Sequence, residues 1–230
     1  MKRFTLGGLL LSTGLILSGC GGSDDATSVS EEKAKEEPKS AEQKEVKNEI
    51  PKPGKDEAGN TILDVVGQKA ESPEVTAELI KIKDVNETLD IAPLTVTVKN
   101  IKLLKLSNMT EDYKEGLKWA ADTDTIADEV TYLQIAYEAE NKEEKNIGWN
   151  DLMNVVTDKG EQIDAQMKDF IIDDSESDSE FLGKVKKEYT DALIVKSKDI
   201  NKIKLIFGET SDSTSYEEIT PEQQVEYSFE

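Results

Sequence analysis

The chain has 230 residues, of which 49 are acidic, 28 are basic and none is histidine, so its formal net charge is −21. A surface this negative repels nucleic acid and anionic lipid head groups. Without histidine, Ser-His-Asp and Cys-His catalysis and the usual zinc sites are excluded, and the single cysteine allows no internal disulfide.

The first residues have the layout of an export signal. Lys2 and Arg3 form a basic start, and residues 4–17 carry no charge. This run is shorter than the roughly 20 apolar residues that a spanning helix needs, and its length suits the apolar region of a signal peptide. Residues 17–20 then read Leu-Ser-Gly-Cys, a motif that resembles the lipobox of bacterial lipoproteins.

The lipobox resemblance implies a lipid anchor at Cys20. Residues 1–19 would be removed as a lipoprotein signal peptide, which leaves a net charge of −23, and the Cys20 sulfur would carry a diacylglyceryl group. One acyl chain holds a protein to a membrane only marginally, whereas two hold it firmly. Gly21 stands where an aspartate commonly directs inner-membrane retention in diderm bacteria. We therefore expect a lipid-anchored protein on the extracellular face of the cell membrane, with the type of envelope left open. The alternative is a chance cysteine after an ordinary signal.

Residues 20–74 are predicted to be a disordered, charged tether. They are dense in Glu, Lys, Pro and Ser, and low hydrophobicity with many charges is typical of disorder. The sequence PKPG at residues 51–54 would end any transient helix. A flexible coil of this length spans roughly 40 Å root-mean-square. It would serve as a stalk through a polymer mesh, or as a plain linker.

Residues 75–230 are predicted to fold as an all-β domain that starts with a period-two pattern. Residues 94–98 alternate apolar and polar, which is typical of a strand with one buried face. Asn100 is a candidate bulge, after which Ile101 and Leu103 resume the inward set. Residues 108–124 then have helical spacing, with Asn108 as the N-terminal cap.

The following segments predict further strands and complete the sandwich. The strongest strand lies within residues 129–141, with Leu133, Ile135 and Tyr137 inward and Gln134 outward. A hairpin and three later strands follow, at residues 151–163, 183–197, 200–208 and 223–229, the last of them an edge strand. Seven or eight short strands with one small helix favour a two-sheet sandwich, and about 155 residues suffice for its core.

Three pieces in this order resemble a known domain family: residues 89–104 (LDIAPLTVTVKNIKLL), 129–149 (EVTYLQIAYEAENKEEKNIGW) and 200–208 (INKIKLIFG). After a lipobox and a charged linker, they look like the immunoglobulin-like domain of unknown function carried by many Gram-positive surface lipoproteins. That domain is related in fold to secreted mycobacterial immunogenic antigens. The resemblance covers roughly residues 87–230 and implies an immunoglobulin-like β-sandwich at the cell surface, without implying any catalytic residue.

Two acidic clusters are candidate calcium sites, since calcium takes six to eight oxygen ligands. The first cluster comprises Asp173, Asp174, Glu176, Asp178 and Glu180, and the second comprises Asp122, Asp124, Asp128 and Glu129. Neither has the EF-hand spacing with its central glycine, so the sequence favours solvated loops, and no metal is assigned.

The remaining motifs do not indicate a catalytic or phosphate-binding site. The Ser-x-x-Lys motif at Ser30–Lys33 lies in the predicted tether, where no rigid, desolvated site is expected. No glycine-rich phosphate loop is present. Trp149 and Trp119 are each either a core residue or an exposed anchor for a protein partner.

These observations favour a non-enzymatic binding or interaction module displayed on the membrane. We expect no catalytic residue and no cofactor, and a partner in the cell envelope or among extracellular proteins. One alternative is an enzyme, or an enzyme accessory, that acts on cell-wall material through paired carboxylates. The other is a lipoprotein that binds a solute or calcium.

Overall fold

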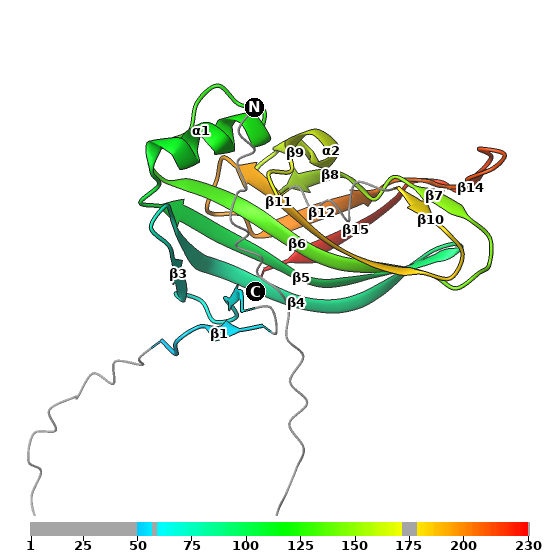
Figure 1. Cartoon of the computed structure of the whole chain (residues 1–230), viewed down its shortest axis with the longest axis horizontal. Helices are drawn as coiled ribbons and strands as arrows, with labels where there is room; N and C mark the ends of the chain where they lie inside the picture. Colours follow the sequence, from blue (N-terminus) through cyan, green and yellow to red (C-terminus); the bar gives the residue numbers. More distant parts are fainter. Residues whose placement is uncertain (1–49, 57–58, 172–178, 230) are drawn as a thin grey trace, which may run out of the picture.

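The first layer is a long antiparallel sheet. The computed structural model describes residues 50–56, 59–171 and 179–229. Within them, five strands pair in the order β11-β6-β5-β4-β3 and form the curved sheet in the foreground of Figure 1. Their bounds are Lys186–Val195, Val130–Asn141, Leu94–Ser107, Thr76–Ile91 and Lys69–Glu71.

The second layer consists of two short sheets placed end to end. One has the order β15-β12-β8-β9, with bounds Gln223–Ser228, Lys202–Phe207, Leu152–Thr157 and Gln162–Asp164. The other has the order β10-β7-β13-β14, with bounds Glu180–Phe181, Ile147–Trp149, Thr210–Asp212 and Glu218–Thr220. The chain passes from β7 to β8 and from β12 to β13 across two residues each. Gly208 lies at this junction, where a Cβ would overlap the carbonyl oxygen of Asn150.

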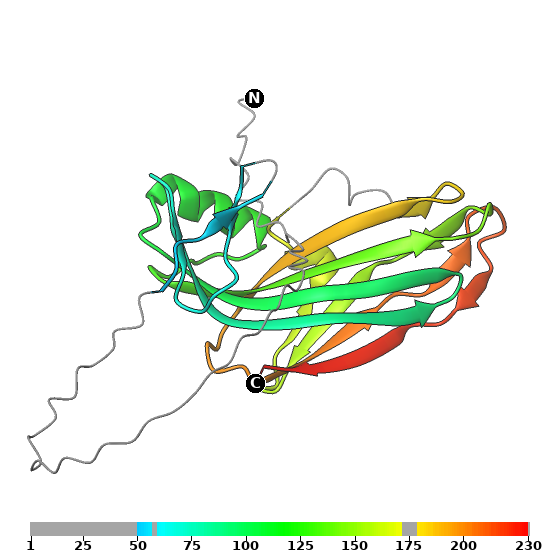
Figure 2. The same cartoon turned by 90° about the horizontal axis from the view of Figure 1, so that it is seen from below.

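In the described residues, two helices and a small two-stranded ribbon complete the fold. The helices are α1 (Glu111–Ala120) and α2 (Ala165–Lys168), and the ribbon pairs β1 (Gly54–Lys55) with β2 (Thr61–Ile62). Figure 2 shows α1 and the ribbon gathered at one end of the elongated sandwich. The expected all-β sandwich is confirmed, while its assignment as immunoglobulin-like stays a prediction.

The main core lies between the two layers. It is formed by the inward residues expected from the period-two pattern, among them Leu133 and Ile135 of β6 and Ile203 and Leu205 of β12. An aromatic cluster fills the half of this core that is remote from α1. It contains Tyr137, Trp149, Phe181, Tyr189 and Phe207. The rings of Tyr137 and Tyr189 stack with centroids 4.9 Å apart, and Trp149 meets both of them edge to face.

A second core covers part of the outer face of the five-stranded sheet. Leu104 of β5 and Tyr132 of β6 pack there beneath Leu117 of α1, Leu63 and Phe170. This packing corrects the predicted domain boundary. Leu63 is buried and Ala70 of β3 nearly so, so the predicted disordered tether at 20–74 is wrong for its last residues, and the folded unit begins before residue 75.

The predicted helix is present, with a different cap. Leu117 is buried and Tyr113 packs partly against the second core, as the helical spacing indicates. The N-cap is Thr110, whose side-chain oxygen accepts a hydrogen bond from the Tyr113 backbone N–H at 3.2 Å. Asn108, the predicted cap, instead has a left-handed backbone, with φ of 54°.

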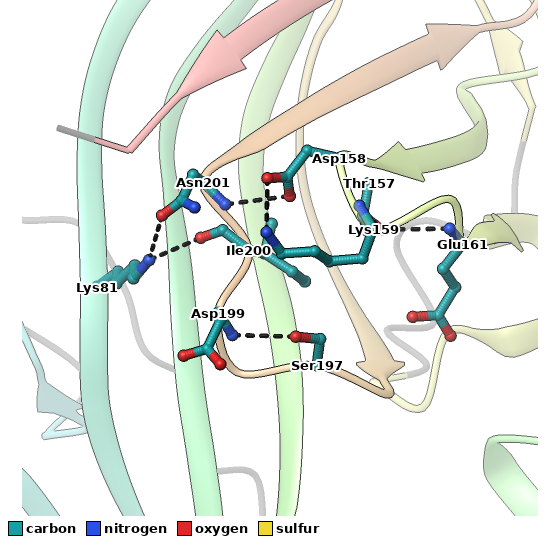
Figure 3. Close-up of polar contacts among 9 residues, drawn as sticks. All are labelled: Lys81, Thr157, Asp158, Lys159, Glu161, Ser197, Asp199, Ile200 and Asn201. Atoms are coloured by element: carbon teal, nitrogen blue, oxygen red, sulfur yellow. Dashed lines mark hydrogen bonds and ion pairs between the residues drawn. The ribbon is translucent and has the colours of Figure 1, made fainter.

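A group of polar contacts joins the two layers beside the loop that leads into β12. Figure 3 shows Lys81 of β4 reaching across to this loop. Its Nζ donates to the backbone oxygen of Ile200 at 2.8 Å and to Oδ1 of Asn201 at 2.9 Å. The Asn201 backbone N–H donates in turn to Oδ1 of Asp158 at 3.1 Å. These contacts link strand β4 of one layer to the loop of the other, which indicates a structural clamp.

We predict that Lys81→Met lowers the free energy of unfolding by about 1–3 kcal/mol, because the buried Ile200 carbonyl loses its charged donor. Urea denaturation monitored by tryptophan fluorescence measures this change. Lys83→Met on the same strand is the matched control, since no described contact is lost there. Equal stability of the two variants would contradict the clamp.

Candidate functional site

Four loops meet at the end of the sandwich that is remote from α1. We call residues 92–93, 142–146, 182–185 and 213–217 the distal loop surface. They connect β4 to β5, β6 to β7, β10 to β11 and β13 to β14, and Figures 1 and 2 show these turns together at the right-hand end. Loops at the ends of a sandwich carry binding functions because a rigid scaffold positions them.

Asn141, the last residue of β6, joins two of these loops. Its Nδ2 donates to the backbone oxygens of Lys145 and Gly183, both at 2.8 Å, and its Oδ1 accepts from the Glu143 backbone N–H at 3.0 Å. The side chain is fully buried. Gly183 has φ of 71°, so the turn it forms needs glycine. The loop geometry is therefore fixed by a satisfied, buried amide.

Asp212 at the end of β13 organises the third loop. Its Oδ1 accepts from the backbone N–H groups of Thr214 and Ser215 at 2.7 and 2.8 Å, and its Oδ2 forms an ion pair with Lys145 at 2.6 Å. The Lys145 ammonium and these two N–H groups hold the pKa of Asp212 far below its usual range. The carboxylate thus links the β13–β14 turn to the β6–β7 loop.

The fourth loop is attached through one carbonyl. The backbone oxygen of Ala92 accepts hydrogen bonds from the hydroxyls of Thr210 and Thr220, at 2.7 and 2.6 Å. These threonines belong to β13 and β14, whereas Ala92 belongs to the turn between the two longest strands. Loops from both layers are therefore held together before any partner is present.

Large side chains project from this fixed platform. Tyr216 at the tip of the β13–β14 turn is 83% exposed, and Leu182 in the β10–β11 turn is 60% exposed. Tyr216 has φ of 59°, an uncommon conformation for a bulky residue, stabilised by a hydrogen bond from its backbone N–H to the Asp212 carbonyl at 2.8 Å. The arrangement presents rigid apolar area with an aromatic hydroxyl, which suits protein recognition.

Several residues singled out in the sequence lie outside the described residues. They are Cys20, the motif at Ser30–Lys33 and most of the acidic loop, including Asp173 to Asp178. Glu180 of that loop is described and begins β10. The expectations for the lipid anchor and for the loop therefore stay predictions.

Two members of the second acidic cluster form ion pairs with lysines. Asp128 contacts Lys114 of α1 at 2.8 Å, and Glu129 contacts Lys105 of β5 at 3.4 Å. In the part of the chain that the structure describes, no three acidic, histidine or cysteine residues are grouped so that they could hold a metal ion.

The two tryptophans have opposite environments. Trp149 is buried in the main core, and its Nε1–H donates to the Gly208 carbonyl at 3.1 Å, so it is not an exposed anchor. Trp119 is 79% exposed on α1, at the end of the sandwich opposite the distal loop surface.

Two carboxyl groups beside α2 have raised pKa values. Burial raises the pKa of Asp169 to about 7; hydrogen bonds from the Ala192 and Ile171 N–H groups oppose this, and the charge of Asp151 adds to it. Burial also raises the pKa of Asp151, although Gln166 donates a hydrogen bond to it. Both carboxyls are engaged by neighbouring groups of the fold.

We predict that Asp169→Asn makes the protein more stable at pH 8 and leaves its stability unchanged near pH 4. The folded carboxyl binds a proton with a pKa of about 7, against about 4 when unfolded, so wild-type stability falls as pH rises through this window. The gain at pH 8 is at most about 4 kcal/mol. Urea unfolding at pH 4, 6 and 8 measures it, with the exposed Asp90→Asn as control. A gain that does not vary with pH would contradict this account.

The residues that organise the distal loop surface could not be identified from the sequence, because their role is hydrogen bonding within loops. The run Asp212-Ser-Thr-Ser is typical of an Asx turn and would have indicated a tight, ordered loop. No pattern marks Asn141 as a buried link, or Tyr216 as a protruding aromatic residue.

Comparison with protein-family models, with curated proteins and with solved structures finds no match for this chain. None of the helices in the described residues has the length and apolar character to cross a bilayer.

Proposed function

We propose that this chain is a lipid-anchored extracellular protein whose β-sandwich is a non-enzymatic interaction module, and that its partner in the cell envelope binds the distal loop surface. The observation that carries the proposal is the pre-ordered platform around Asn141 and Asp212, which presents Tyr216 and Leu182 to solvent. Pre-ordered loops lose little conformational entropy on binding.

The position of the platform supports the same proposal. The β1–β2 ribbon, through which the chain enters the sandwich, lies at the same end as α1, whereas the distal loop surface lies at the other end (Figures 1 and 2). Cys20 precedes Ile50 by thirty positions, enough to reach about 100 Å if extended. A module anchored at Cys20 can therefore turn its distal end away from the membrane.

The electrostatics favour binding over catalysis. Two carboxylates of the platform are paired with lysines, Asp212 with Lys145 at 2.6 Å and Glu144 with Lys184 at 2.8 Å. The carboxyls of raised pKa, Asp151 and Asp169, accept hydrogen bonds from neighbouring groups of the fold. This arrangement supports a recognition role, in which charge pairs fix loop shape and exposed apolar groups bind.

We predict that Cys20→Ala moves the protein from the membrane fraction to the medium, or leaves it unprocessed. The thioether to the diacylglyceryl group cannot form without the sulfur, and the two acyl chains provide the membrane affinity. Fractionation of cells grown with radiolabelled fatty acid measures the change. Equal labelling of the variant would refute the anchor.

We predict that the double variant Tyr216→Ser with Leu182→Ser weakens partner binding about tenfold or more, because buried aromatic and aliphatic anchors dominate interface energies. The full chain is solubilised from membranes of its own cells, and co-purifying envelope components are quantified by mass spectrometry.

The matched control is Trp119→Ser with Met167→Ser, which removes two other exposed apolar side chains, neither of them on the distal loop surface. The proposal expects this control to retain the partner. A control that loses the partner, while the distal variant keeps it, would assign recognition to the helical end instead.

A further inference from the structure

Three polar side chains are buried together on the outer face of the five-stranded sheet. Asn100 and Lys102 of β5 are each 2% exposed, and Gln134 of β6 is 1% exposed. Lys102 and Gln134 are direct cross-strand partners, and Asn100 pairs with Ala136 one step along. Side chains opposite each other on neighbouring strands lie about 5 Å apart at Cβ, so the three form one group.

A bulge in β5 places them there. The pairing of β5 with β6 shifts register between Val98 and Asn100. Before the shift, Val96 and Val98 face the main core; after it, Ile101 and Leu103 do. Without the extra residue, Asn100 and Lys102 would point into the main core. Bulges recur beside functional sites because they re-aim side chains in this way.

None of the three side chains has a partner among the residues that the structure describes. Oε1 of Gln134 is buried and accepts no hydrogen bond. Neither Lys102 nor Asn100 makes a side-chain hydrogen bond or an ion pair with the described part of the chain. Buried polar atoms are nearly always hydrogen-bonded, so the unsatisfied Oε1 of Gln134 is unusual.

The charges around the group limit what it can bind. Burial lowers the pKa of the Lys102 ammonium, while the charges of Asp64 and Asp84 act in the opposite direction. Both aspartates are exposed, so their charges act on Lys102 from the solvent side. One cation with two carboxylates at its border suits a monoanion better than a dianion such as phosphate.

The hydrogen-bonding groups narrow the chemistry further. Lys102 offers donors to an anion, the amides of Asn100 and Gln134 offer donors and acceptors, and Oε1 of Gln134 requires a donor from the ligand. Ala136 and Ala192 lie beside the group, and Leu104 lies two residues further along β5. The border of the group is therefore apolar on this side, which suits a ligand with a small apolar substituent.

We propose that Asn100, Lys102 and Gln134 form a binding site for a small carboxylate that carries an N–H donor beside its charge, as in an N-acylated amino acid or the carboxyl-terminal residue of a peptide. The carboxylate contacts Lys102, and the adjacent N–H donates to Gln134. This site is independent of the distal loop surface.

Two readouts on the full-length chain test the site. The first is the melting temperature without ligand. Lys102→Met replaces an unpaired buried cation by an apolar side chain of similar length, and we expect the melting temperature to rise by a few degrees. A lysine with a purely structural role would instead lower it on substitution.

The second readout is binding, followed by amide chemical shifts of β5 and β6. N-acetylalanine at millimolar concentration should shift these signals saturably in wild type, whereas N-acetylalanine amide and inorganic phosphate should not. Lys102→Met should abolish the response, Gln134→Leu should weaken it at least several-fold, and Lys105→Met on the same strand should keep it. Acetyl-trialanine is titrated in parallel. Tighter binding of acetyl-trialanine than of N-acetylalanine indicates the carboxyl-terminal residue of a peptide as the ligand, and weaker binding indicates a free N-acyl amino acid.

Absence of any saturable wild-type response to either carboxylate, up to tens of millimolar, overturns the proposal. So does a response that Lys102→Met leaves unchanged. If Lys102→Met does not fold, the Gln134→Leu result decides.

Discussion

The fold depends on a long sheet that must be covered along one whole face and along part of the other. β5 has 14 residues, which at about 3.3 Å per residue span roughly 45 Å. The strands opposite are far shorter, since β8 and β12 have six residues each. Two short sheets placed end to end supply the missing length, and their junction requires the close approach of Gly208 to Asn150. On the other face, α1, Leu63 and Phe170 cover the part nearest α1.

This mismatch in length also explains where function is placed. The short sheet β10-β7-β13-β14 extends the second layer to the end of the long strands that is remote from α1. Turns from both layers therefore lie side by side at that end. Asn141 and Asp212 then join these turns by hydrogen bonds and an ion pair. At the other end, the same long strands carry α1 and the point where the chain enters. The sandwich thus separates the end where the chain enters from the end that bears the distal loop surface.

Much of the fold follows from local pattern, because period-two alternation reports burial on one face. The strands around Leu133 and Ile203, and the helix around Leu117, were predictable in this way. The boundary near Leu63 was not, since isolated apolar residues in a polar stretch become buried only by docking onto a distant sheet. Gln134 faces away from the main core as expected, yet it is buried, because a sequence with one apolar stripe does not reveal a second covered face. The candidate sites were not predictable either, because they depend on a bulge and on loop hydrogen bonds that bring distant residues together.

The central claim is that the end of the sandwich bearing Tyr216 meets the partner. Photo-cross-linking in intact cells tests it most directly, with p-benzoylphenylalanine placed at position 216 in one variant and at position 119 in another. Both positions are highly exposed, so the probes have comparable access to their surroundings. The account predicts a discrete cross-linked product from position 216 and none from position 119. A product from position 119 alone would contradict it.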